Sequence, residues 1–313
     1  MVTEELARGW MSVPSLLARG NTMGCDVADP DRRAELLRRS ARGEWIGAFS
    51  GSEPGAGSDL AAVSCRATRD REEWVIDGEK RWTGNAIRSH FILLLARTRD
   101  PAPGEPRSAG IDRFLIEKEP GTLPPGVTAT PIDKVGYHGI TTFTLTISGL
   151  RLPESAKLPG EGFRDTVQAL NIARVHTAAR AVGLARGALE DSHEYLLERQ
   201  QFDHPLADFQ ALRFAVADMA TEIAAAKALT YQAAAAIDAG DLSPTFPAIC
   251  KLAATEMAVR VTNQAMQLHG GNGYTTERRV ERYWRDARLT TIFEGTSEIQ
   301  KTLIADQLLG RRR

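Results

Sequence analysis

One carboxylate in this chain, Glu294, stands where it could act as a base toward a carbon acid. It lies in the run Ile292-Phe293-Glu294-Gly295-Thr296-Ser297-Glu298-Ile299-Gln300, after two large apolar residues and before a Gly-Thr break that starts a helix. Apolar neighbours desolvate a carboxylate and raise its basicity, and a base that removes a proton from carbon needs that increase. The run also fits an ordinary loop that ends in a helix cap, so the rest of the chain must decide.

Composition limits the class of protein. The chain has 313 residues, enough for roughly two domains, and its 42% hydrophobic and 25% charged residues are typical of a globular protein. A net charge of −1 argues against nucleic acid or an acidic membrane as a partner. The start of the chain is unlike a signal peptide and no apolar run reaches membrane-spanning length, so we expect a cytoplasmic protein.

The three cysteines, Cys25, Cys65 and Cys250, are widely spaced and odd in number. This pattern predicts neither a metal site nor a disulfide framework and suits a reducing compartment. Cys250 lies among apolar residues and is interpreted as buried packing. The terminal run Arg311-Arg312-Arg313 is expected to be solvated.

Three zones follow one another along the chain. Residues 1–43 contain helical fragments at 4–18 and 29–42. Residues 44–155 change to period two and predict an all-β domain, with strands at 91–96, 113–117 and 142–147. Within this zone, residues 74–82 predict two short strands joined by a hairpin turn at Asp77-Gly78.

Residues 156–313 predict long helices. An apolar stripe at alternating steps of three and four consists of Phe209, Leu212, Val216, Met219 and Ile223. The next helix is expected to end at Leu268, where glycine supplies the left-handed cap. Ser297 and Gln300 have capping-box spacing and predict a last helix that ends at Gly310.

Several segments together resemble the acyl-CoA dehydrogenase family of flavoproteins. They are Ser52-Glu53-Pro54-Gly55-Ala56-Gly57-Ser58-Asp59, Asp77-Gly78-Glu79-Lys80-Arg81-Trp82-Thr83-Gly84-Asn85-Ala86, Glu198-Arg199-Gln200-Gln201-Phe202-Asp203-His204-Pro205-Leu206 with Phe209-Gln210, Gln267-Leu268-His269-Gly270-Gly271-Asn272-Gly273-Tyr274, and Arg285-Asp286-Ala287-Arg288 leading into Phe293-Glu294-Gly295-Thr296. Each segment alone is a weak signal, but five in this order make coincidence improbable. The resemblance covers about residues 44–310.

The resemblance implies an α+β multidomain fold. It consists of a remnant of an N-terminal helical domain (1–43), a central antiparallel β-barrel-like domain (44–155) and a C-terminal four-helix bundle (156–313). FAD lies between the β domain and the bundle in this family, whose members are homotetramers or dimers of fatty acid metabolism. An electron-transfer flavoprotein is the implied redox partner, and no metal is implied.

The resemblance also implies which residues bind FAD. Those along the flavin and pyrophosphate are Phe49, Gly51, Ser52, Ser58, Trp82, Thr83 and Gly84, where hydroxyls and free backbone N–H groups suit polar flavin edges or phosphate. Residues of the site shared with a neighbouring subunit are Arg199, Phe202, Gln210, Gln267, Leu268, His269, Gly270 and Gly271, and the contacts at a helix start are Thr296 and Glu298.

Some of these residues have simpler interpretations. Without the family match, Trp82 is interpreted as a core residue on a hairpin, Arg199 as a solvated side chain and His269 as a helix-end residue. We assign no proton-transfer role to His269. Many relatives read Trp-Ile-Thr-Asn where this chain has Trp82-Thr83-Gly84-Asn85. The hydroxyl expected near flavin N5 is therefore displaced or absent.

The implied reaction is α,β-dehydrogenation of an acyl thioester to the trans-2-enoyl product. Glu294 removes the α-proton while hydride leaves the β-carbon for flavin N5, and the flavin ribityl hydroxyl and the backbone N–H of Glu294 stabilise the enolate. Relatives that place the base on an earlier helix do so at the position of Ala173, so Glu294 has no visible rival. Asn171, Arg174 and Gly295 are the implied substrate contacts, although Arg174 fits a helix-pair cap equally well.

Other functions remain open at this level. An acyl-CoA oxidase or an acyl-carrier-protein-linked dehydrogenase shares most of these residues. A non-catalytic partner subunit is the alternative of a different class, and Glu294, Trp82 and Arg199 argue against it because a binding protein needs no base.

Overall fold

The computed structural model describes residues 1–241 and 243–310, so the predicted solvated run 311–313 lies outside the described residues. The chain forms two compact units. One contains Met1–Pro14, Val135–Tyr137 and the chain from Gln168 onward, and the other contains Ser15–Lys134 and His138–Val167. No described helix is both long enough and apolar enough to cross a membrane.

The second unit is built on a curled, seven-stranded mixed sheet within the described residues. Its strands are β1 (Gly47–Ser50), β2 (Arg66–Asp70), β3 (Glu73–Gly84), β4 (Phe91–Arg97), β5 (Ile111–Glu117), β6 (Val127–Pro131) and β7 (Thr142–Pro153). The order is β1-β4-β2-β3-β7-β6, with β5 also paired to β4. Short 3-10 turns lie at Leu60–Ala62 and Glu154–Ala156, and α3 (Pro30–Ala41) begins after the Asp29 cap.

The three strands predicted at 91–96, 113–117 and 142–147 are confirmed. The sheet is not wholly antiparallel, because β1 and β2 each pair with β4 in parallel. The apolar faces of β2, β3, β4 and β7 meet in one core, in which Trp74 contacts Phe114 edge-on at 5.5 Å between ring centroids.

The predicted hairpin at Asp77-Gly78 is wrong. β3 continues through both residues, with irregular register against β7 between Ile76 and Gly78 and again between Lys80 and Thr83. Gly78 has φ of 150°, and a Cβ there would lie 2.8 Å from Cys65 Cα. β3 has neighbours on both sides, β2 and β7, so the Asp-Gly pair forms a bulge instead of reversing the chain.

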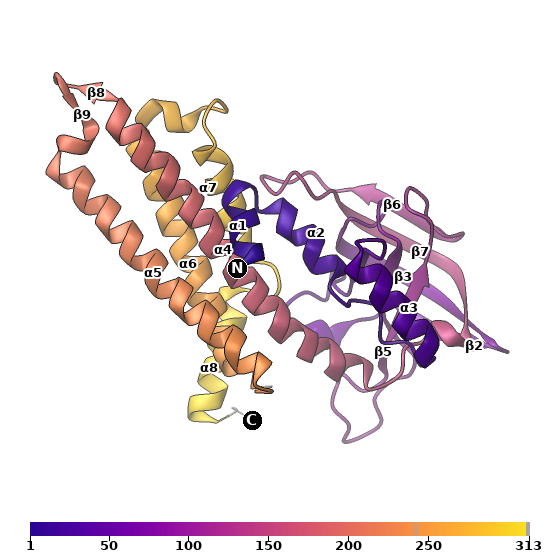
Figure 1. The fold of residues 1–313 in the computed structure, drawn as a ribbon. Coiled ribbons are helices and arrows are strands. Elements are labelled where there is room, and N and C mark those ends of the chain that lie inside the picture. Colours follow the sequence, from indigo (N-terminus) through magenta and orange to yellow (C-terminus); the bar gives the residue numbers. More distant parts are fainter. Residues whose placement is uncertain (242, 311–313) are drawn as a thin grey trace. The chain divides into compact units, whose positions relative to one another are not determined.

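The other unit is helical (Figure 1). Its elements are α1 (Val2–Gly9), the start of α2 (Ser12–Gly20), most of α4 (Gly162–Glu198), the short strands β8 (Gln200–Gln201) and β9 (His204–Pro205), α5 (Gln210–Asp238), α6 (Thr245–Leu268), α7 (Val280–Thr290) and α8 (Ser297–Leu309), with 3-10 turns at Leu206–Asp208 and Gly270–Tyr274. α6 packs against α5, α7 and α8.

Helix boundaries mostly follow the sequence. Met219 and Ile223 of the predicted stripe are buried, as is Cys250, and α6 ends at Leu268 before Gly270 in the left-handed region, as predicted. The single helix expected at residues 4–18 is divided into two helices, α1 and α2. The cap of α8 is Thr296, whose hydroxyl accepts from the Ile299 N–H, and not the predicted Ser297.

Candidate active site

Glu294 lies in the tight turn between α7 and α8. Its φ is 55°, in the left-handed region that non-glycine residues rarely adopt, and Gly295 follows at 90°. The Gly295 carbonyl accepts hydrogen bonds from Lys251 Nζ of α6 and from Gln300 Nε2 of α8. A non-glycine residue in the left-handed region raises the conformational energy of the backbone by about 1–2 kcal/mol. These contacts hold the turn in that conformation.

Two residues of α4 hold the Glu294 carboxylate. Thr177 donates its hydroxyl to Oε2, and Arg180 Nη2 lies 2.8 Å from Oε1. Arg180 Nη2 also donates to the Thr177 hydroxyl at 2.7 Å. Residues three apart on a helix share a face, so both side chains meet one carboxylate, whose side chain is 26% exposed.

An aromatic ring lies against the Arg180 guanidinium. Its Cζ lies 4.8 Å from the centroid of the Phe293 ring, and Phe293 contacts Tyr137 edge-on at 6.0 Å between centroids. Tyr137 is itself fixed, because its backbone N–H donates to Asp286 Oδ1 at 2.5 Å. The site therefore has a dry aromatic side next to the charged pair.

The predicted rise in the basicity of Glu294 is wrong. Burial does raise the pKa of Glu294, but the charge of Arg180 and the hydrogen bonds from Thr177 and Arg180 lower it, and the net pKa is below the ordinary value. A nearby cation outweighs the desolvation that the Ile-Phe pair predicts.

The predicted substrate contacts lie close to this turn. Arg174 and Asn171 are both buried on α4, and Arg174 Nη1 donates to Asn171 Oδ1. Burial lowers the pKa of Arg174, and the charge of Glu294 opposes that shift. Arg174 and Glu294 therefore act on each other electrostatically, whereas the substrate role of Arg174, Asn171 and Gly295 stays a prediction.

Most of the predicted flavin contacts of the β unit lie at the junction of β1 and β3. Ser50 and Thr83 share a hydrogen bond of 2.8 Å between their hydroxyls, and the Ser52 carbonyl accepts from the Arg81 N–H at 2.8 Å. These contacts bring Phe49, Gly51 and Ser52 together with Trp82, Thr83 and Gly84. Ser58 is exposed on the following loop.

Trp82 is not a core residue, unlike its interpretation without the family match. It has φ of 67° at the second bulge of β3, and its side chain is 54% exposed with Arg81 over its ring at 4.9 Å. A large aromatic ring displayed at a bulge is available to stack on a planar ligand. The Thr83 hydroxyl instead faces Ser50 in the interior, and its position relative to a flavin stays a prediction.

The predicted inter-subunit contacts lie at one end of the long helices. Arg199 and Gln210 are exposed on either side of the β8–β9 ribbon, and Phe202 at its tip is 85% exposed. Gln267, Gly270 and Gly271 are exposed, whereas Leu268 is buried. His269 is also buried, stacks on Tyr195 at 4.3 Å between centroids and binds the Ala265 carbonyl through Nδ1. Burial lowers the pKa of His269, which fits a neutral helix-end residue.

A cavity of about 300 Å³ adjoins the start of α8. It is lined by Glu256, Val259, Arg288, Thr291, Ile292, Thr296, Ser297 and Glu298. The two predicted dinucleotide contacts, Thr296 and Glu298, thus line one hollow at a helix start. The N–H groups there already have partners, since Ser297 donates to the Thr291 carbonyl and Ile299 to the Thr296 hydroxyl.

Sequence reasoning missed Thr177, Arg180 and Lys251. The signal for Arg180 was present, because it interrupts the small apolar residues Ala178, Ala179, Ala181 and Val182 of a helix. A charge among residues of that kind is expected to be buried and paired. Its partner is 114 positions away, and no local pattern indicates such a pairing.

Comparison with known proteins shows the family of the chain. Residues 48–150 match the family model of the acyl-CoA dehydrogenase middle domain, and residues 160–309 match that of its C-terminal domain. The chain is 36% identical over 313 residues to the human mitochondrial short-chain specific acyl-CoA dehydrogenase, covering 98% of this chain and 74% of that protein. It belongs to the acyl-CoA dehydrogenase family.

Two further proteins are similar over almost all of the chain. (2S)-methylsuccinyl-CoA dehydrogenase of Cereibacter sphaeroides is 38% identical over 99% of this chain, which spans 58% of that protein's length. A glutaryl-CoA dehydrogenase of Mycobacterium smegmatis, solved in complex with FADH2, has a TM-score of 0.89 and 29% identity, covering 99% of this chain and 79% of the other. The predicted fold class is confirmed by such structures.

Proposed function

We propose that this protein is an FAD-dependent acyl-CoA dehydrogenase in which Glu294 removes the α-proton of the thioester. The observation that carries the proposal is the strained turn that presents the Glu294 carboxylate, held by Thr177 and Arg180, next to aromatic rings. A loop that only capped a helix would need neither a left-handed glutamate nor a buried cation beside it.

The residues at the junction of β1 and β3 fit a flavin. The exposed indole of Trp82 offers a face for a planar ring system, and the Ser52 region offers backbone groups beside small residues. In the helical unit, the Thr296 hydroxyl lines the hollow at the α8 start and is the proposed dinucleotide contact there. Oxidised FAD, when bound, supplies the acceptor for the hydrogen and the two electrons that leave the β-carbon.

The protein residues carry out the proton transfer. Glu294 accepts the α-proton at its carboxylate, and its own backbone N–H is the proposed donor that stabilises charge on the thioester oxygen. Arg180 and Thr177 fix the direction of the carboxylate, since both bonds are made on one face of α4. Phe293 and Tyr137 exclude water on one side, which strengthens these interactions.

The names of two relatives, specific for short-chain acyl-CoA and for methylsuccinyl-CoA, support a short acyl group as the substrate. An electron-transfer flavoprotein is the proposed acceptor of the electrons and a homo-oligomer the proposed assembly, in the cytoplasm. The predicted domain boundaries at 43 and 155 also stay a proposal. An oxidase is the second candidate, favoured by the Thr83 hydroxyl that faces Ser50 instead of the protein surface.

The test uses the purified 313-residue chain. We expect yellow flavin absorbance and its bleaching under anaerobic conditions by a short acyl-CoA, with little hydrogen peroxide formed when air is admitted. Stoichiometric peroxide without any other acceptor would replace the dehydrogenase by an oxidase. A folded, assembled protein that binds no FAD would favour the non-catalytic subunit.

A further inference from the structure

The guanidinium of Arg19 occupies the space that a side chain at Gly84 would take. A Cβ atom at Gly84 would lie 2.6 Å from Arg19 Nη2 and 3.2 Å from Ile140 Cγ2, and both distances are shorter than an ordinary van der Waals contact. Any side chain at position 84 would therefore push the end of the Arg19 side chain aside. Gly84 admits the guanidinium to this part of β3.

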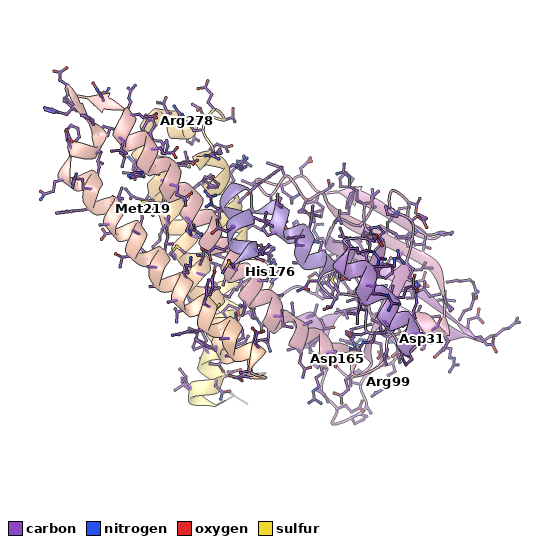
Figure 2. All side chains as sticks on the ribbon, in the orientation of Figure 1. Asp31, Arg99, Asp165, His176, Met219 and Arg278 are labelled. Carbon is purple, nitrogen blue, oxygen red and sulfur yellow. The ribbon has the colours of Figure 1, made fainter. Side chains whose placement is uncertain are left out.

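Most of the donors of Arg19 have no partner in the protein. Arg19 lies in the last turn of α2, whose side chains are drawn in Figure 2, and is half-buried. Its Nη1 donates to the Ser15 carbonyl at 2.8 Å, which is the only hydrogen bond of its side chain within the described residues. No described carboxylate forms an ion pair with it. A guanidinium has five N–H donors in a planar fork, so Arg19 keeps both donors and an uncompensated charge.

This guanidinium lies on the face of β3 that carries the exposed indole of Trp82. Successive side chains of a strand point to opposite faces. Thr83 points inward to Ser50, and Gly84 follows it in register with β7, so a Cβ at Gly84 points away from Ser50. Trp82 also points away from Ser50 and is 54% exposed, although Arg81 lies over one face of its ring. A planar ligand stacked on Trp82 would therefore meet N–H donors beside it.

A flavin ring system has the chemistry that these donors recognise. One edge of this planar ring carries carbonyl oxygens and ring nitrogens that accept hydrogen bonds. The ring is neutral when oxidised and gains one negative charge when it accepts hydride from the β-carbon, while Glu294 takes the α-proton. A cation held at that edge stabilises the added charge, and such a charge is one means by which a protein tunes a flavin.

We propose that Arg19 donates hydrogen bonds to the acceptor edge of the flavin ring that stacks on Trp82, and that its charge raises the midpoint potential of the bound flavin. The inference rests on the proposed function, since it takes FAD as the ligand of Trp82. Gly84 takes part because a larger residue there would displace the guanidinium from this position.

The experiment measures the midpoint potential of the flavin bound to the purified 313-residue chain, by anaerobic reductive titration against a reference dye. The wild type is compared with Arg19→Gln, Gly84→Ala and the double variant. Gly84→Ala keeps the net charge and only moves the guanidinium. Arg151→Gln is the matched control, because it removes the same charge at the opposite end of β3, where Arg151 pairs with Glu73.

We expect Arg19→Gln to lower the equilibrium constant for reduction of the bound flavin on the order of tenfold, the equivalent of about 30 mV for a two-electron couple. Gly84→Ala should lower it in the same direction. The double variant should lose no more than Arg19→Gln alone, since both changes remove one interaction. Arg151→Gln should keep the wild-type potential.

An unchanged potential in Arg19→Gln would overturn the inference, and a fall in Tm alone would leave Arg19 as a residue that supports the end of α2. Fully additive losses in the double variant would overturn it too, because the guanidinium would then not act from the space at Gly84. If Arg19→Gln does not fold, Gly84→Ala decides in the same way. If the folded wild type binds no FAD, it is the proposed function that fails.

Discussion

Each unit of the protein contains a carboxylate that is paired with a buried cation at 2.8 Å, but the two pairs are built differently. In the β unit, Glu53 accepts from the Ser64 N–H and hydroxyl, the Cys65 N–H and Lys80 Nζ. Both oxygens are saturated, and the side chain is 5% exposed. Glu294 has two side-chain donors, Thr177 and Arg180, and is 26% exposed.

The difference separates a structural pair from a reactive one. Lys80 also donates to the Gly51 carbonyl, so the Glu53 pair fastens the Gly51–Ser58 loop to β3. A saturated carboxylate cannot accept a proton from a substrate without breaking that network. Glu294 keeps accessible surface on a strained turn, which is what proton transfer requires. In both cases burial raises the carboxyl pKa, and the paired cation reverses the shift.

The strongest test of this contrast replaces each carboxylate by its amide. Glu294→Gln should slow flavin reduction by on the order of 10⁴-fold or more, because it removes the base. Flavin content should stay at the wild-type level. Stopped-flow absorbance measures the rate, and a Glu294→Gln protein with near-normal turnover would remove Glu294 from the reaction. Glu53→Gln should show the opposite pattern, with loss of stability and flavin content.

The next largest effect is expected for Lys80→Met. It leaves the Glu53 carboxylate buried without its cation, which costs about 3–5 kcal/mol in the free energy of unfolding. Arg260→Gln, at the exposed pair with Glu222, should change stability by less than about 1 kcal/mol. Chemical denaturation measures both changes. Similar small losses in the two variants would contradict the structural role of Lys80.

A smaller effect is expected for Thr177→Val, which keeps the shape and removes the hydroxyl. The hydrogen bond from Thr177 lowers the pKa of Glu294, so its loss raises that pKa. The acid limb of the kcat/KM profile should move to higher pH by up to about one unit, the equivalent of one hydrogen bond. Thr177→Ser keeps the hydroxyl and should leave the limb in place. No difference between Val and Ser would show that the hydroxyl does not tune the base.

The smallest effect concerns Lys251, which supports the Glu294 turn through the Gly295 carbonyl. Burial lowers the pKa of Lys251 from 10.5 to about 8. The folded state therefore binds fewer protons than the unfolded state between these values, so stability rises as pH increases from about 8 to 10.5 and falls as pH decreases through 8. The Tm of the wild type relative to Lys251→Met should increase by on the order of 2 °C over this range. A constant difference would mean that Lys251 titrates normally.

Local signals predicted much of the framework. β4 and β5 and the ends of α6 and α8 follow from periodicity, glycine and capping residues, all of which act within a few positions. The Asp77-Gly78 pair shows the limit of that logic. A turn preference of this kind is weak beside the backbone hydrogen bonds that β3 makes to β2 and β7, so the strand continued.

The sequence by itself determined which carboxylate to consider, because Glu294 stands in a run whose apolar residues and Gly-Thr break are local and whose family match is specific. Only the tertiary structure decided the direction in which the pKa of that carboxyl group shifts. Thr177 and Arg180 reach it from 117 and 114 positions away, and their hydrogen bonds and charge reverse the shift that the neighbouring Ile and Phe predict. Electrostatic interactions act through space over a few ångströms, and the fold alone determines which groups are that close.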